Sequence, residues 1–136
     1  MSDGYAAVAL YVGLNALLLL ALAYNVGARR GAQKALEPGA TGDAALMRAI
    51  RAHGNFAEYA PVALLILAAL ALNNTAALPV HILGAAFTIG RVLHAIGMMR
   101  ETHPNAVRFF GNLLTGLVLL LGGGLCVLRF YEALTP

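Results

Sequence analysis

Charged residues are scarce in this sequence, and cysteine is almost absent. Only 11% of the 136 residues are charged, whereas 60% are hydrophobic. A typical soluble domain carries about 25% charged residues, so the composition excludes an ordinary soluble domain. The single cysteine, Cys126, excludes an intramolecular disulfide. It lies in an apolar stretch without the cationic, partly exposed surroundings that a reactive thiolate needs.

Motifs of several soluble protein classes are also missing. No spacing of cysteine and histidine is typical of a zinc site. No predicted strand is followed by a glycine-rich phosphate-binding loop. The basic residues flank apolar stretches, as membrane orientation requires, and do not form a separate patch. We therefore expect neither a metal site nor a nucleic-acid partner.

The hydrophobic residues are concentrated in four apolar stretches. Each is long enough to span a membrane, because roughly 20 helical residues cross about 30 Å of hydrocarbon. They lie near residues 5–28, 49–72, 79–98 and 107–131. With polar extensions, they predict helices over about 5–28, 44–72, 79–98 and 105–132. The expected fold is all-α, an integral membrane four-helix bundle that forms one domain over residues 1–136. Gly27 is predicted to end the first helix, and Asn73-Asn74-Thr75 predicts a turn after the second.

Basic residues gather at one end of this bundle. In a four-span topology the first and third loops share a side. That side holds Arg29, Arg30, Lys34, Arg48, Arg51, Arg100 and Arg108, while the other side holds Arg129. Cytoplasmic loops are enriched in Lys and Arg, so loops one and three are predicted to be cytoplasmic and both termini to lie outside.

The first turns of the second helix carry a charged face. Placing charged side chains in a membrane-spanning segment costs free energy unless they are paired or used. At 100° per residue, an arc of roughly 80° contains Arg48, Arg51, Asn55 and Glu58. His53 lies off this face, and a structural contact is expected for it.

The topology brings polar residues of the other helices to the same depth. Helix three contributes Arg91 and His94, and helix four contributes Arg108 and Asn112. Glu58 is the only acid inside this layer, so arginine is in surplus and favours a small, multiply charged anionic ligand. A lipophilic co-substrate could reach the same layer from the bilayer. The alternatives are pairing among these groups or contact with lipid headgroups.

The residues of this layer resemble a known family. Arg51-Ala-His-Gly-Asn55-Phe-Ala-Glu58 resembles the helix-two signature of MAPEG, the membrane-associated proteins in eicosanoid and glutathione metabolism. Gly90-Arg91-Val-Leu-His94 is similar to its helix-three motif, and Arg108 falls where its helix-four arginine is expected. The resemblance covers all four helices.

This resemblance implies a homotrimer that binds glutathione as co-substrate between subunits at the cytoplasmic side. The implied activity is that of a glutathione-dependent transferase or peroxidase acting on lipophilic electrophiles or lipid hydroperoxides. Arg108 would be catalytic by stabilising the glutathione thiolate. The glutathione-binding residues would be Arg29, Arg30, Arg48, Arg51, Asn55, Glu58, Arg91, His94 and Asn112. The resemblance leaves open which of Arg29 and Arg30 enters the site.

Departures from the family pattern favour a bacterial-type member, with the bacterial inner membrane as its expected location. Gly54 and Met98 stand where some members carry Arg and Tyr, and Phe109 and Asn112 replace hydroxyl-bearing side chains beside Arg108. The first alternative is therefore a non-catalytic lipid-binding or scaffold protein on the same fold. A small transporter is less favoured, because Glu58 lies in the cytoplasmic-side layer and not at the midplane.

Overall fold

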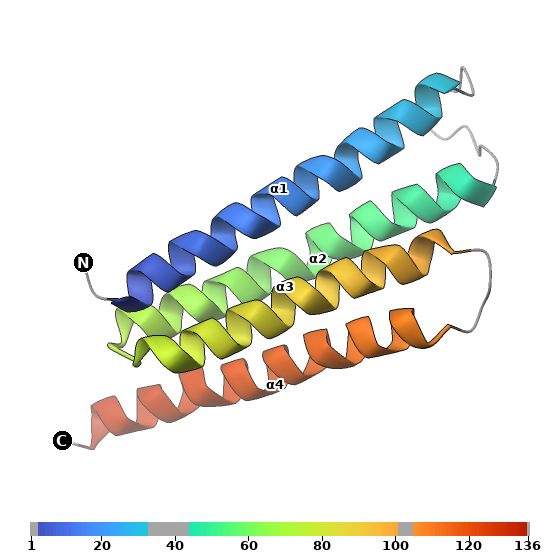
Figure 1. The fold of residues 1–136 in the computed structure, drawn as a ribbon. Helices are drawn as coiled ribbons and strands as arrows, with labels where there is room; N and C mark the ends of the chain where they lie inside the picture. The colour runs from blue at the N-terminus through green and yellow to red at the C-terminus, as the bar shows by residue number, and fades with distance from the viewer. Residues whose placement is uncertain (1–2, 33–43, 101–104, 136) are drawn as a thin grey trace.

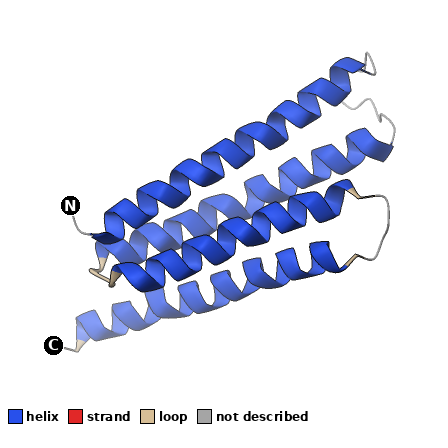
Figure 2. Ribbon diagram, viewed as in Figure 1, coloured by secondary structure: helices blue, strands red, loops and turns tan. Residues whose placement is uncertain are grey.

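The computed structural model describes residues 3–32, 44–100 and 105–135, and these ranges contain four helices and no strand (Figures 1 and 2). The helices are α1 (Asp3–Ala32), α2 (Ala44–Leu72), α3 (Ala77–Met99) and α4 (Ala106–Leu134). Each is long and apolar enough to cross a membrane. The predicted all-α, four-helix membrane fold is therefore confirmed.

The four helices do not pack equally. They run up and down, so that both ends of the chain lie at the same end of the bundle (Figure 1). Half of the most apolar segment of α3 is buried, against 22% for α1 and 17% for α4. Both α2 and α3 pack against all the other helices, whereas no contact joins the described parts of α1 and α4. The bundle therefore has a central pair, α2 and α3, with α1 and α4 on its flanks.

Helical periodicity explains which face of α1 turns inward. Its buried residues recur at steps of three, four and seven, which places them on one side of a helix. These residues are Gly4, Ala7, Tyr11, Asn15 and Leu22. The opposite side is apolar as well, and Leu17 and Leu20 are each 66% exposed. Such exposure suits a helix whose outer face is solvated by lipid.

Glycines allow α3 and α4 to approach closely at the end of the bundle that carries the charged residues. A Cβ atom on Gly97 would lie 2.5 Å from the backbone nitrogen of Arg108. A Cβ atom on Gly111 would lie 2.5 Å from the backbone nitrogen of His94. Small residues at helix contacts are how membrane helices reach van der Waals packing. This contact holds Arg108 and His94 next to each other.

The predicted turn after α2 is confirmed. Asn74 has φ 53° and so adopts the left-handed conformation that asparagine tolerates. Its backbone nitrogen donates to the carbonyl of Ala71 (3.1 Å), and that of Thr75 donates to the carbonyl of Leu70 (3.0 Å). These two bonds form a Schellman motif, which satisfies the carbonyls at the end of α2.

The predicted end of the first helix is wrong. Helix α1 passes through Gly27 and ends at Ala32. A glycine inside a helix costs only about 1 kcal/mol relative to alanine. One turn around Gly27 is bridged by Arg29, whose Nε donates to Asn25 Oδ1 at 3.0 Å. Lys34, which was expected in the following loop, lies outside the described residues.

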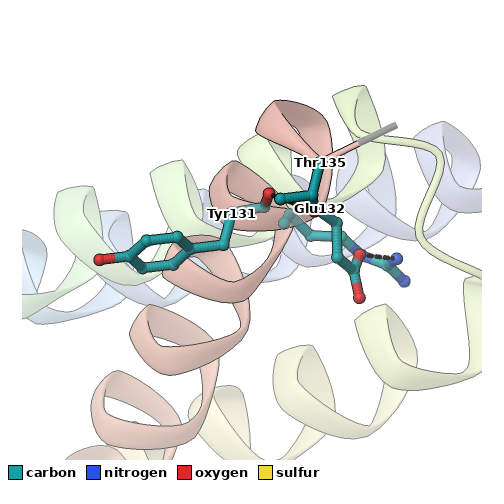
Figure 3. Close-up of polar contacts among 4 residues, drawn as sticks. Tyr131, Glu132 and Thr135 are labelled. Carbon is teal, nitrogen blue, oxygen red and sulfur yellow. Dashed lines mark hydrogen bonds and ion pairs between the residues drawn. The ribbon is translucent and has the colours of Figure 1, made fainter.

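The two ends of α4 are capped by side chains. At its start, Asn105 Oδ1 accepts from the backbone nitrogen of Arg108 at 2.8 Å. At its far end, Arg129 pairs with Glu132 at 2.7 Å, and Thr135 Oγ1 donates to the carbonyl of Tyr131 at 3.1 Å. Figure 3 shows that Tyr131 and Glu132 point to different sides of the helix there.

Candidate functional site

A cavity of about 280 Å³ lies between α2, α3 and α4, where α3 ends and α4 begins. Most of its lining is polar or charged. The lining residues are Arg51, Gly54, Asn55, Glu58, His94, Met98 and Arg108. Five of these seven were predicted as site residues from the sequence.

Helix α2 supplies one charged wall of this cavity. Arg51, Asn55 and Glu58 follow one another at steps of four and three, so they share a helix face as predicted. Arg48 lies one turn earlier and is not among the described residues that line the cavity. The predicted face therefore contributes its last three members to the cavity.

Arg91 lies behind the cavity and is only 1% exposed. Its Nη2 donates to Asn55 Oδ1 at 2.7 Å and its Nη1 to Thr115 Oγ1 at 3.4 Å. Its guanidinium carbon lies 5.5 Å from the centre of the Tyr59 ring and 6.0 Å from that of Phe56. Among the described residues, this buried cation is thus held by neutral groups and aromatic faces. It adds positive charge to the cavity wall and fixes Asn55.

His94 is oriented by α4. Its Nδ1 lies 2.9 Å from Asn112 Oδ1. An amide oxygen only accepts, so Nδ1 carries the proton in this pair and Nε2 is left as an acceptor in the neutral ring. Nε2 is buried and has no hydrogen-bond partner in the part of the chain that the structure describes. The ring is therefore a fixed part of the cavity wall.

The charges that line the cavity are not neutralised by one another. Within residues 3–32, 44–100 and 105–135, the side chains of Arg51, Glu58 and Arg108 form no ion pair and no hydrogen bond. Glu58, which could have paired with an arginine of this layer, pairs with none of them there. Two cations and one anion are therefore presented to the cavity, with Arg91 behind them.

The two arginines of α1 lie elsewhere in the single chain. Arg29 contacts Asn25, and Arg30 lines a separate cavity of about 230 Å³ together with His53. In the described part of the chain, neither arginine lines the cavity that Arg108 lines. His53 does not line the charged cavity in the described part of the chain, and the structural contact expected for it stays a prediction.

Several residues that shape the site had no predicted role. Gly54 is only a departure from the family pattern in the sequence, whereas Met98 also continues the helix face of Arg91 and His94; both line the cavity. Tyr59 and Phe56 flank the charged face of α2, and no sequence signal connects them to Arg91. Thr115 follows Arg108 by seven residues, so the sequence predicts it on the same helix face, but it does not predict that the Thr115 hydroxyl accepts from Arg91. In the described ranges, no group of three or more His, Cys, Asp and Glu residues could hold a metal.

The fold and this cavity define the class: an integral membrane protein with four spanning helices and a charged site near one end of the span. The MAPEG family model matches residues 8–128. The inner membrane protein YecN of Escherichia coli K12 is 37% identical over 89 residues, which cover 65% of this chain and 67% of YecN. The uncharacterized protein sll1147 of Synechocystis is 32% identical over 122 residues, which cover 88% of this chain and 87% of that protein. The chain belongs to the MAPEG family.

Proposed function

We propose that this protein is a homotrimeric membrane enzyme that uses glutathione to conjugate lipophilic electrophiles or to reduce lipid hydroperoxides. The observation that supports this most is the set of charges at the cavity that pair with no side chain of the described residues. Arg51, Arg108 and Glu58 lie close together without neutralising one another. A ligand with complementary charges would supply the missing partners.

Glutathione has the required chemistry. It carries two carboxylates, one ammonium group and one thiol. Arg51 suits a carboxylate, which a guanidinium can bind through two parallel hydrogen bonds. Glu58 suits the ammonium group. Asn55 is held in place by Arg91, so this wall of the site is organised before the ligand arrives.

Arg108 is assigned to the thiol. A free thiol has a pKa of about 8.5 and is mostly protonated near neutral pH, whereas the thiolate is the nucleophile. Lowering its pKa by one unit requires about 1.4 kcal/mol. Two opposite charges 4 Å apart interact by about 4 kcal/mol at an effective dielectric constant of 20. One guanidinium next to the sulfur is therefore sufficient.

A trimer would complete the site with the arginines of α1. Among the described residues of one chain, Arg29 contacts Asn25 and Arg30 lines another cavity, so in this proposal a neighbouring subunit brings one of them to the site. YecN is named an inner membrane protein, and we assign the same location to this chain. Seven of its nine basic residues belong to the end formed by loops one and three, which we place in the cytoplasm, with both termini outside.

A non-catalytic lipid-binding or scaffold role on the same fold is the second candidate. It is favoured by the surroundings of Arg108, where Asn112 is engaged with His94 and Phe109 is 62% exposed. Neither side chain offers a hydroxyl to the thiol. Turnover separates the two roles, because a scaffold would bind glutathione or lipid without accelerating the conjugation of a model electrophile.

Binding of glutathione to the purified protein in detergent tests the proposal. Equilibrium dialysis with labelled glutathione should give a saturable isotherm. Arg51→Ala and Glu58→Gln should each weaken the affinity roughly tenfold or more, because each removes a charge-assisted hydrogen bond. Arg129→Ala is the matched control, since Arg129 pairs with Glu132 at the opposite end of α4. If the affinity is the same in all of these proteins, α2 is not the binding face.

A further inference from the structure

Asn112, on α4, contacts the buried ring of His94 with one end of its amide. Its Oδ1 lies 2.9 Å from His94 Nδ1, which carries the proton of this bond. His94 is only 2% exposed, whereas Asn112 is an exposed residue. The oxygen and the nitrogen of an amide diverge from the same carbon. With its oxygen turned to the buried ring, Asn112 therefore directs its NH₂ group away from that ring, toward the outside of the bundle.

The NH₂ group of Asn112 is a donor without an acceptor in the part of the chain that the structure describes. There the side chain makes no hydrogen bond besides the one to His94. Arg108 lies four residues earlier, so the two side chains are neighbours on one flank of α4. Arg108 lines the charged cavity, and Asn112 is not among its lining residues. A directed donor thus lies beside the arginine assigned to the thiol, just outside the glutathione cavity.

This donor lies at the edge of an apolar, lipid-facing surface. Only 17% of the most apolar segment of α4 is buried, and Phe109 and Leu113 are 62% and 44% exposed. Asn112 follows Ala106, the first residue of α4, by six residues, which is about 9 Å along the axis. A helix of 29 residues is about 43 Å long and extends about 7 Å beyond each side of a 30 Å hydrocarbon layer. A lipophilic molecule from the bilayer would meet the polar site at this depth.

Reduction of a lipophilic hydroperoxide would place negative charge where such a donor is useful. The thiolate attacks the distal oxygen, so an S–O bond forms, the O–O bond breaks, and its electron pair leaves with the proximal oxygen as an alkoxide. Sulfur is oxidised to a sulfenic acid, and the hydroperoxide is reduced. Water protonates the alkoxide, and a second glutathione converts the sulfenic acid to the disulfide and water. A donor aimed at the proximal oxygen stabilises the transition state more than the ground state.

Conjugation of a halide electrophile makes no such demand. The thiolate attacks carbon, an S–C bond forms, the C–Cl bond breaks, and chloride leaves with the electron pair into water. No oxygen becomes anionic. The two reactions share the glutathione thiolate and differ in the need for a donor at the leaving oxygen.

We propose that Asn112 sets the preference of the enzyme among its lipophilic co-substrates. Its NH₂ group donates to the oxygen that becomes the alkoxide, and so favours hydroperoxides over halide electrophiles. His94 is a positioning residue for this contact, because it fixes the other end of the amide. The inference rests on the glutathione-dependent function proposed above and adds the group that recognises the co-substrate.

The ratio of two specificity constants tests this role. For each purified protein in nanodiscs, kcat/KM is measured with cumene hydroperoxide and with benzyl chloride at one pH and one saturating glutathione concentration. Dividing the first value by the second cancels glutathione binding and thiolate formation, which both reactions share. Asn112→Leu should lower this ratio about 10- to 100-fold, because it removes a donor to a developing charge.

A second variant separates the two ends of the amide. Asn112→Asp keeps an oxygen for His94 but has no NH₂ group, so the ratio should fall at least as far as in Asn112→Leu. A native ratio in Asn112→Asp would overturn the proposal, because release of His94 would then explain the loss in Asn112→Leu. Should Asn112→Leu fail to fold, Asn112→Asp alone decides. Asn73→Leu is the matched control, since it removes an exposed amide at the opposite end of the bundle and should keep the native ratio.

The remaining outcomes separate this inference from the function on which it rests. An undiminished ratio in Asn112→Leu would overturn the role of Asn112. So would a native protein that conjugates benzyl chloride without reducing the hydroperoxide. In both cases the glutathione-dependent activity itself stands. A native protein that turns over neither substrate and forms no glutathione thiolate would refute the proposed function, and this inference with it.

Discussion

Replacing Gly97 with alanine tests whether the close contact of α3 and α4 positions the site. The added Cβ would lie 2.5, 2.6 and 2.7 Å from the backbone nitrogen, the Cβ and the Cα of Arg108. The shortest of these is 0.9 Å below the 3.4 Å at which ordinary contact begins. Two of the three atoms belong to the backbone, so no side-chain rotation can relieve the overlap. The start of α4 would have to move away from α3.

The size of the effect follows from two opposing contributions. Overpacking of a well-packed contact costs about 1–3 kcal/mol. Alanine in place of a helical glycine contributes up to about 1 kcal/mol in the opposite direction. Gly116 provides the control, because among the described residues no atom outside its own stretch of helix lies within 4 Å of the Cβ that Gly116→Ala would add. The helix-propensity contribution is common to both variants, so their difference isolates the overpacking.

The assay is thermal unfolding in one detergent at a fixed scan rate, followed by circular dichroism. We expect the apparent midpoint of Gly97→Ala to lie roughly 3–10 °C below that of Gly116→Ala. Glutathione thiolate formation should also fall in Gly97→Ala, because Arg108 is displaced. Equal midpoints together with equal thiolate formation would refute the claim that this contact sets the position of Arg108.

Two further predictions concern stability. Asn55→Leu removes the acceptor that lies 2.7 Å from Arg91 Nη2 and should lower the unfolding free energy by about 1.5–3 kcal/mol. The same change should cost much less in an Arg91→Met background, and equal costs in the two backgrounds would show that the bond does not stabilise the fold. Asn74, at φ 53°, should tolerate glycine without loss of stability, whereas Asn74→Val should cost about 1–2 kcal/mol. Thermal unfolding checks this pair, and equal midpoints for glycine and valine would contradict the left-handed turn.

The helices were predictable because hydrophobic length and the requirement to satisfy every backbone group in lipid leave few alternatives. The error at Gly27 shows where this reasoning stops. Apolar length fixes the membrane-spanning part of a helix but not its extension into water, where local bonds such as that between Arg29 and Asn25 decide. The turn at Asn74 was predictable because its residue types have a strong local preference.

The charged wall of α2 was predictable from periodicity alone, since Arg51, Asn55 and Glu58 share one face. The partner of each side chain was not. That Arg91 binds Asn55 and not Glu58 depends on the depth and rotation of two helices, which the sequence does not specify. That Asn15 Oδ1 has no partner among the described residues was not predictable either, because it depends on the hydrogen-bond directions of Thr88.

The most direct test of the central claim is the thiolate absorbance of the detergent-purified protein, titrated with glutathione near neutral pH. We predict a saturable rise that is lost in Arg108→Ala, while equilibrium dialysis shows that the variant still binds glutathione. A folded protein that binds glutathione without any rise in thiolate absorbance, or an Arg108→Ala variant with an undiminished rise, would contradict the assignment of Arg108 as the group that activates the thiol.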